Sequence, residues 1–495
     1  MEWLSFEGWV LMVISVCAVC ACKALMVKRE EKGVEREGEG FVIPRGSWGW
    51  PLIGETLEFI ASGYTSRPVS FMEKRKSLYG DVFRTNILGK AIVVSTDPDV
   101  SKMILLNHGN DAFIPCYPKS ITELLGKSSI LQMNGPLHKR VHALIGVFLK
   151  STSLKARITR DIEKVIRLSL SSWMDKSYHV HLQDETKKIT FEILVRVLMS
   201  IGPGDEMECL KREFEEFIKG LICLPVNLPG TRLYKSLKAK ERLLKIVGKI
   251  VTERKMATEK NEEKGMPNDA IDVLLRDSGE SDGMQEHRLP LDFISGNIIE
   301  MMIPGEETMP TAMTLAVKFL TDNPVALAHL VEENMELRKR KVQSSEEYSW
   351  HDYMSLPFTQ NVINETLRLA NIINAVWRKA LKDVKIKGYL IPKGWCVMTS
   401  FSSVHMDETN YENPNEFDPW RWKEIGAAAN SNIFTPFGGG QRLCPGLELS
   451  RLQISIFLHH LVTTYRLSAQ KDEIIYFPTV RMKRKLPITV TPLEQ

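Results

Sequence analysis

The sequence predicts a mainly α-helical protein with a minor β part, and three observations support this fold class. Most of Ser101–Lys341 carries apolar side chains at helical period. Strand-like patterns are short, and Val82–Ile87 and Ala91–Ser95 form a predicted hairpin joined through residues 88–90. The composition, 43% hydrophobic and 25% charged, is that of a globular protein. A chain of 495 residues has two or more domains by default, with large helical cofactor enzymes as the exception.

The N-terminal residues are predicted to form a membrane anchor. Residues 8–27 are apolar apart from Ser15 and Lys23, and two basic residues follow them. A spanning helix needs roughly 20 apolar residues, and a basic side chain near its end can reach the interface. A cleaved signal peptide is the alternative, but acidic Glu2 and Glu7 stand where its basic end would be. We expect residues 1–27 to be a single-pass anchor that leaves the rest of the chain in the cytoplasm.

Residues 28–54 are predicted to connect this anchor to the body of the protein. Residues 28–40, KREEKGVEREGEG, mix charges with glycine and lack a periodic apolar face, which is typical of solvated linker. Residues 43–54, IPRGSWGWPLIG, combine prolines, glycines and tryptophans, which favours a stiff, partly buried hinge. The remaining residues, 55–495, form one predicted catalytic domain.

Within that domain, several segments have clear helical patterns. Leu210–Ile222 and Leu233–Lys255 are predicted amphipathic helices, separated by a segment with two prolines and a glycine. Phe293–Leu320 is a predicted helix, and Thr359–Leu369 is another. Residues 252–290 are charged apart from a short apolar patch at 270–275, so we expect an exposed connection there.

The stretch FGGGQRLCPG, residues 437–446, places one cysteine in a glycine-rich loop. Because Pro445 is favoured at the first position of a helix, Cys444 is predicted to be its N-cap. The first free amides, near Gly446 and Leu447, would then face the sulfur and stabilise a thiolate. Glycines 438–440 would admit a large flat group, and Arg442 adds a fixed charge nearby. This pattern suits haem, with sulfur on iron and guanidinium on a propionate; a buried structural cysteine is the alternative.

Two further motifs carry charged residues at helical spacing. Glu365 and Arg368 lie three residues apart on a predicted helix, so they share one face; a solvated surface pair is the ordinary alternative. In IPGEETMP, residues 303–310, both prolines lack an N–H, so the helix is expected to bend and leave carbonyls available. Glu307 and Thr308 could then handle water and protons there, although an acidic surface turn is the alternative.

The loop resembles the haem-binding loop of cytochromes P450, F-x-x-G-x-R-x-C-x-G, and matches it at every fixed position. The resemblance implies the cytochrome P450 fold and haem b, with Cys444 as the axial ligand of the iron. It also implies a haem-binding loop that includes Phe437, Gly440, Arg442 and Gly446.

The same resemblance assigns roles to residues elsewhere in the chain. It implies a structural ionic triad of Glu365, Arg368 and, in FDPWRW, Arg421. It implies oxygen activation and proton relay by Glu307 and Thr308, although Pro304 departs from the usual alanine or glycine.

It further implies haem contacts from His138 and Arg378. His142 stands where the family often has a propionate-binding arginine, and Lys139 or Arg140 could supply that contact in its place.

The order of anchor, linker, hinge and motifs is similar to that of a microsomal cytochrome P450. This implies the endoplasmic reticulum membrane, contact with membrane lipid, and NADPH electrons delivered by a separate NADPH–cytochrome P450 reductase. The net charge of +4 is too small and too evenly mixed with acid to indicate nucleic acid binding.

Longer segments, such as LPGTRLYKSLKAKERL and MMIPGEETMPTAMTLAVKFL, are similar to the plant P450s of brassinosteroid biosynthesis, especially the steroid C-23 hydroxylases. This implies O2-dependent hydroxylation of a 22-hydroxylated steroid such as 3-epi-6-deoxocathasterone at carbon 23. The alternatives are another carbon of a related sterol or terpenoid, a haem-thiolate isomerase or dehydratase, and a haem-thiolate protein without monooxygenase activity. The expected pocket segments are Phe113–Tyr117, Ile121–Leu131, Ile298–Met302, Asn371–Val376 and Phe477–Val480, with Asn371 and Asn374 available to a hydroxyl or ketone.

Overall fold

The computed structural model describes residues 40–51, 53–106, 112–173, 179–260, 267–276, 288–426 and 432–493. They fall into two compact units, one of residues up to 114 with 375–403, the other of residues 115–374 with those from 404 onward. The predicted anchor, residues 1–27, and most of the predicted linker lie outside the described residues. Among the residues that are described, no helix combines the length and apolarity needed to cross a membrane.

The first unit is built on a five-stranded sheet with the order β1-β2-β8-β5-β3. The strands are β1 (Val82–Ile87), β2 (Lys90–Ser95), β3 (Phe113–Pro115), β5 (Ala375–Ala380) and β8 (Cys396–Ser400). The predicted hairpin is confirmed, since β1 and β2 are antiparallel with Val82 opposite Ser95. Leu88 and Gly89 both have positive φ, 54° and 70°, as a two-residue turn between twisted strands requires. β2 and β8 are parallel, so the chain returns to this sheet from a distant part of the sequence.

The remaining elements of the first unit are short. They are α2 (Thr56–Ser62), α3 (Ser70–Tyr79), α4 (Pro98–Leu106) and the hairpin β6 (Val384–Ile386) with β7 (Tyr389–Ile391). The described part of residues 28–54 bonds to this unit: Val42 N–H donates to Gly388 in the turn between β6 and β7, and Arg45 accepts from Arg84 N–H of β1 at 2.9 Å. A Cβ on Gly46 would lie 1.9 Å from the Arg84 carbonyl oxygen, so this close approach requires glycine.

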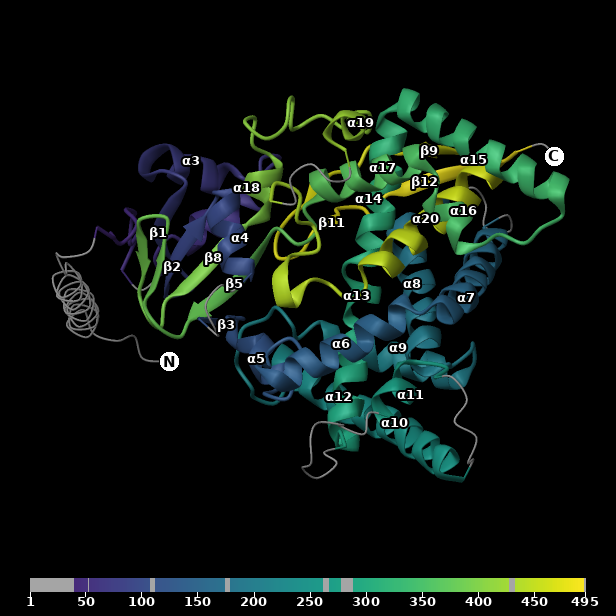
Figure 1. The fold of residues 1–495 in the computed structure, drawn as a ribbon, viewed down its shortest axis with the longest axis horizontal. Helices are drawn as coiled ribbons and strands as arrows, with labels where there is room; N and C mark the ends of the chain where they lie inside the picture. The colour runs from purple at the N-terminus through teal and green to yellow at the C-terminus, as the bar shows by residue number, and fades with distance from the viewer. Residues whose placement is uncertain are drawn as a thin grey trace, which may run out of the picture. The chain divides into compact units, whose positions relative to one another are not determined.

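The second unit is mainly helical, and the predicted fold class, mostly α with a minor sheet part, is confirmed (Figure 1). Its longer helices are α6 (Pro136–Lys150), α7 (Thr152–Ser171), α8 (Leu182–Met199), α9 (Asp205–Ile218), α10 (Arg232–Lys260), α14 (Met309–Asp322), α15 (Pro324–Ser344), α17 (Pro357–Ala370) and α20 (Leu447–Thr464). Its shorter helices are α5 (Lys119–Leu125), α11 (Ala270–Leu275), α12 (Leu291–Met301), α13 (Ile303–Glu306), α16 (Trp350–Met354), α19 (Arg421–Ile425) and the 3₁₀ turn η1 (Gly440–Arg442). The boundary between the units falls inside α18 (Phe401–His405).

The β part of the second unit is small. A three-stranded sheet has the order β4-β12-β9, made of β4 (His179–His181), β9 (Tyr465–Ala469) and β12 (Pro487–Pro492). A separate antiparallel pair joins β10 (Ile474–Ile475) to β11 (Arg481–Met482).

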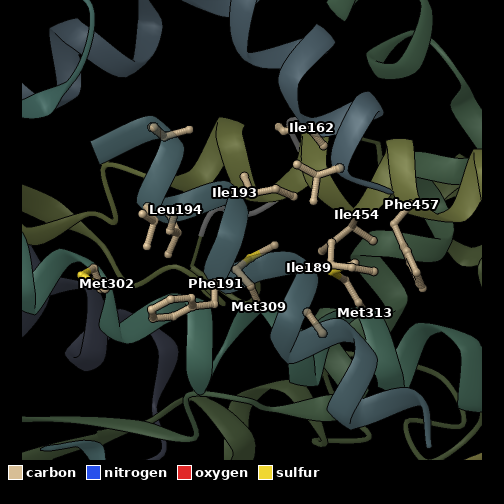
Figure 2. Packing of buried hydrophobic residues seen from close by; sticks show 14 of the residues in the cluster. Ile162, Ile189, Phe191, Ile193, Leu194, Met302, Met309, Met313, Ile454 and Phe457 are labelled. Carbon is tan, nitrogen blue, oxygen red and sulfur yellow. The ribbon is translucent and has the colours of Figure 1, made fainter. Parts of the chain in front are cut away.

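One apolar core joins the helices of this unit. α14 packs against α8, α17 and α20, and α20 also packs against α7, α15 and α16. Figure 2 shows Ile189 of α8 beside Met313 of α14, with Ile454 and Phe457 of α20 next to them. All four side chains are at most 2% exposed, so each contributes about 1.5–3 kcal/mol of burial to the fold. This core fixes α20, whose N-terminus follows the cysteine loop.

Two predictions from the sequence, one of an exposed connection and one of a bent helix, differ in detail from the structure. The predicted exposed connection, residues 252–290, contains a helix that is partly buried: α11 places Ala270, Ile271 and Leu274 in the core. Asp269 caps it by accepting a hydrogen bond from the Asp272 amide. Six residues were too few to show a helical period, and tertiary packing decided their state.

The predicted bent helix at 293–320 is three helices, α12, α13 and α14. Pro304 and Pro310 stand at the starts of α13 and α14, where their missing N–H groups cost least. α8 lies close to this break: Thr190 donates its hydroxyl to the Gly305 carbonyl, and a Cβ on Gly305 would lie 2.7 Å from Leu194. The interruption thus falls at the two prolines, as expected. Met302, Glu307 and Thr308, which lie between the three helices, keep right-handed helical φ and ψ.

Candidate functional site

The cysteine loop is held open by its own backbone hydrogen bonds. Cys444 N–H donates to the Phe437 carbonyl at 3.1 Å, and Leu443 N–H donates to Gly440 at 3.1 Å. Gly438 and Gly440 have φ of +75° and +64°, a region that favours glycine. A Cβ on Gly438 would meet nothing closer than the Arg442 carbonyl oxygen at 3.9 Å, so there is open space beside this glycine.

The predicted N-cap is displaced by two residues. α20 begins at Leu447, and its N-cap is Gly446 rather than Cys444, with Pro445 in the turn before it. Gly446 N–H still hydrogen-bonds the Cys444 sulfur, but Leu447 N–H donates to the Cys444 carbonyl at 3.4 Å. One amide, not a pair, therefore faces the sulfur.

The surrounding protein groups do not stabilise a thiolate on their own. Burial raises the pKa of Cys444, and the hydrogen bond from Gly446 offsets only part of that shift. Among the residues that the structure describes, no group of three histidine, cysteine or acidic side chains could hold a metal ion. A lone sulfur donor in a glycine loop therefore fits a metal that brings its other ligands with it, as haem iron does.

Two neighbouring segments contact this loop. Arg442 donates through Nη1 and Nη2 to the carbonyls of Leu131 and Met133. His142 of α6 donates from Nε2 to the Leu443 carbonyl at 2.8 Å. His142 also lies against His138, a buried residue, with ring centroids 5.5 Å apart. The residue that departs from the family pattern thus contacts the residue before Cys444, while the haem contacts of Arg442 and His138 stay predictions.

The structure brings the three residues of the predicted triad together. Glu365 accepts from Arg368 Nη2 at 2.7 Å and Nε at 2.9 Å, and from Arg421 Nε at 3.0 Å. Trp422 Nε1 and the Asp418 amide complete its partners. Glu365 and Arg368 have no exposed surface, so each charge depends on the other for its stability.

His405 extends this network to the cysteine loop, and sequence reasoning missed it. Its carbonyl accepts from Arg368 Nη1 at 2.8 Å, its Nε2 accepts from Thr435 N–H, and its Nδ1–H donates to Asn371 Oδ1. These two partners fix a neutral imidazole with one tautomer. Burial and the nearby Arg368 charge lower its pKa to about 3. No motif marks this position; only the packing reveals it.

Asn371 therefore has a structural role, as the hydrogen-bond acceptor for His405. It was predicted to meet a substrate hydroxyl or ketone, but it ends α17 at φ 44°, is buried, and bonds His405. Arg378 lies on β5 of the first unit, where its guanidinium donates to the Trp377 carbonyl, and its predicted haem contact stays a prediction.

Glu307 and Thr308 occupy the break between α13 and α14 and are partly exposed. Thr308 donates its hydroxyl to the Pro304 carbonyl at 3.3 Å, and Thr311 donates to the Glu307 carbonyl at 2.7 Å. The neighbouring Glu306 differs, because it is buried and paired with Lys187 Nζ at 2.6 Å. At this break the side chains of Glu307 and Thr308 are therefore partly exposed, whereas Glu306 is paired with Lys187 of α8.

A model of the cytochrome P450 family matches residues 44–490. The chain is 68% identical over 454 residues to a 3-epi-6-deoxocathasterone 23-monooxygenase of Arabidopsis thaliana, covering 92% of this chain and 85% of that protein. It is 51% identical over 465 residues to a second Arabidopsis thaliana protein of that name, covering 94% and 92%.

Two other proteins extend the comparison. Identity is 43% over 452 residues to a 3beta,22alpha-dihydroxysteroid 3-dehydrogenase of Arabidopsis thaliana, covering 90% of this chain and 92% of that protein. The solved structure of retinoic acid-bound cyanobacterial CYP120A1 superimposes with a TM-score of 0.79 at 26% identity, covering 92% of this chain and all of that one.

We predict that Glu365→Gln lowers the free energy of unfolding by about 3–5 kcal/mol, because it leaves Arg368 buried without its counter-charge. Guanidinium unfolding of the purified variant measures this loss. Glu192→Gln is the matched control: it breaks the half-exposed pair with Arg196 and should cost under about 1 kcal/mol. Equal losses in both variants would contradict the structural role of the triad.

We predict that His405 contributes an acid-sensitive part of the stability. Since its folded pKa is lowered to about 3 from 6.5, the unfolded chain alone binds its proton between those values, and stability falls as pH drops below 6.5. From about pH 7.5 to about pH 5.5, the native chain should lose about 1.4 kcal/mol more than His405→Gln. Urea unfolding at both pH values tests this, and identical pH slopes would refute it.

Proposed function

The chain belongs to the cytochrome P450 family, and from that membership we propose that it hydroxylates carbon 23 of a 22-hydroxylated steroid such as 3-epi-6-deoxocathasterone in brassinosteroid biosynthesis. The observation that carries this proposal is the 68% identity with a 3-epi-6-deoxocathasterone 23-monooxygenase over 92% of the chain. In this reaction one atom of O2 enters a C–H bond and the other leaves as water, with two electrons supplied by NADPH.

Membership of the family implies haem b as the cofactor. We expect Cys444 to bind its iron, within the loop that includes Phe437, Gly440 and Gly446. We expect Arg442 and Arg378 to meet the propionates, and His138 to contact the haem. When bound, the haem supplies oxygen activation, which a thiolate ligand favours. The lone sulfur and the positive-φ glycines of the loop support this assignment.

The break between α13 and α14 supports a role for Glu307 and Thr308 in handling protons. Pro310 has no N–H to donate to the Glu306 carbonyl, so the helical ladder is interrupted at this point. A hydroxyl and a partly exposed carboxylate at such a break can hold a water and pass protons to it. An isomerase or dehydratase would not need this acid and alcohol pair.

The electron supply and the location follow from the same proposal. We expect a separate NADPH–cytochrome P450 reductase to deliver the electrons, and residues 1–27 to anchor the protein in the endoplasmic reticulum membrane with its catalytic part in the cytoplasm. An apolar steroid dissolves in that membrane, which fits the predicted anchor. Residues 28–54 would then join the anchor to the catalytic part.

We predict a thiolate-type Soret band in the dithionite-reduced, CO-bound protein, and its loss in Cys444→Ser. A 22-hydroxylated steroid titrated into the ferric protein should then shift the Soret band, and product analysis should find a hydroxyl at carbon 23. A thiolate band without any steroid response would contradict the proposed substrate and would still agree with membership of the cytochrome P450 family. Oxidation at carbon 3 would instead match the relative that is 43% identical.

We predict that Thr308→Ala keeps the thiolate band but yields at least about tenfold less steroid product for each NADPH consumed, because proton delivery is impaired. NADPH oxidation, hydrogen peroxide and product are measured together. Thr321→Ala, which removes a hydroxyl near the end of helix α14, is the control and should keep the native ratio. An unchanged ratio in Thr308→Ala would remove this residue from the proposed relay.

A further inference from the structure

The segment between α5 and α6, residues 128–133, is tied to α12 by two polar side chains. Asn297 accepts from the Ile130 amide at 2.8 Å and donates to the Ser128 carbonyl at 3.2 Å. Glu300 accepts from the Ser129 hydroxyl at 2.6 Å. These contacts join residues that are more than 160 positions apart in the chain.

The two side chains are buried, which makes the contacts strong. Asn297 is 1% exposed and Glu300 is 6% exposed. Burial raises the pKa of Glu300 to about 7, and its bond with Ser129 and the Lys240 charge offset part of that shift. A buried acid of this kind is costly unless it is hydrogen-bonded, so Glu300 and Ser129 hold each other in place.

Other elements fix the C-terminal part of this segment and the end of α5 that precedes it. Arg442 of the cysteine loop donates to the carbonyls of Leu131 and Met133. Lys240 of α10 donates to the carbonyls of Leu124 and Leu125 at 2.8 Å each, where α5 ends. The segment is thus connected both to α12 and to the loop that holds Cys444.

We propose that Glu300 and Asn297 are positioning residues that set substrate specificity by holding residues 128–133 against α12. Ser129 and Ile130 belong to one segment predicted to line the steroid pocket, Ile121–Leu131. Glu300 belongs to another, Ile298–Met302, which Asn297 immediately precedes. The two polar side chains fix the separation of these two walls, and hence the carbon of the steroid that is presented. The inference rests on the proposed steroid hydroxylation and adds the residues that determine its regiochemistry.

The test compares Glu300→Ala and Asn297→Ala with Glu300→Gln, whose amide oxygen can still accept from Ser129. Asp292→Asn is the matched control, because it removes an exposed carboxylate from the first turn of the same helix. Three readouts are taken: the CO-bound spectrum, the steroid Kd from the ferric Soret shift, and the ratio of 23-hydroxylated product to products oxidised elsewhere. Hydrogen exchange of the amides of residues 128–133 is followed without steroid.

We expect both alanine variants to keep the thiolate band, to exchange these amides faster, to bind the steroid about tenfold more weakly, and to spread oxidation over more carbons. Glu300→Gln and Asp292→Asn should stay within about twofold of the native Kd. Should Glu300→Ala fail to fold, Ser129→Ala removes the hydroxyl that donates to Glu300 and leaves the hydrogen bonds from the Ile130 and Leu131 amides in place. The same changes are then expected in the same direction and with a smaller magnitude.

Faster exchange with a native Kd and a native product ratio would overturn the proposal while leaving the proposed function intact. Unchanged exchange would overturn it as well, because the two side chains would then not hold the segment. If the native protein gives no steroid response, the proposed substrate is wrong and the specificity role falls with it. The hydrogen-exchange result would still show whether the two side chains hold the segment.

Discussion

The buried charge on Glu365 is the interaction on which the rest of the candidate site depends. A carboxylate without exposed surface is unfavourable unless its partners compensate it, and here Arg368 and Arg421 do so in hydrogen-bonding geometry. Arg368 then uses its remaining nitrogen to bind the carbonyls of His405 and Pro414, and Arg421 binds the carbonyl of Glu412. A helix is thereby joined to an irregular stretch that has little regular structure to stabilise it. The order of that stretch comes from charge pairing rather than from a sheet or helix ladder.

The cysteine loop is positioned mainly by contacts with this network and with other elements. It is connected to the Glu365 network through Thr435 and His405, to α6 through His142, and to the 128–133 segment through Arg442. What the loop lacks is a means of lowering the pKa of Cys444, because burial outweighs the single amide that faces the sulfur. The protein therefore supplies geometry, and a bound metal would supply the positive charge that a thiolate needs.

Much of this could be predicted from the sequence, and the failures have physical reasons. The helical class, the β1–β2 hairpin and the pairing of Glu365 with Arg368 follow from period, turn residues and spacing, which are local signals. The start of α20, the three-part helix at 291–322 and the burial of α11 depend on packing, which a single sequence does not display. The contacts of His405, Asn297 and Glu300 could not be predicted for the same reason, since their partners lie far away in the chain. Asn371 was expected to be available to a substrate hydroxyl or ketone, because its hydrogen bond to His405 is visible only in three dimensions.

The two hydrogen bonds of the His405 ring limit which residue types can replace it. One small, uncharged side chain must donate to the buried Asn371 on one side and accept from the partly buried Thr435 amide on the other. Lysine and arginine carry donors only, and aspartate and glutamate at neutral pH carry acceptors only. Asparagine and glutamine have both groups on a single carbon, so they cannot span the two partners as an imidazole ring does. Very few other residue types should therefore be tolerated at position 405. Substitutions of His405 should inactivate the protein even though this residue does not contact the substrate.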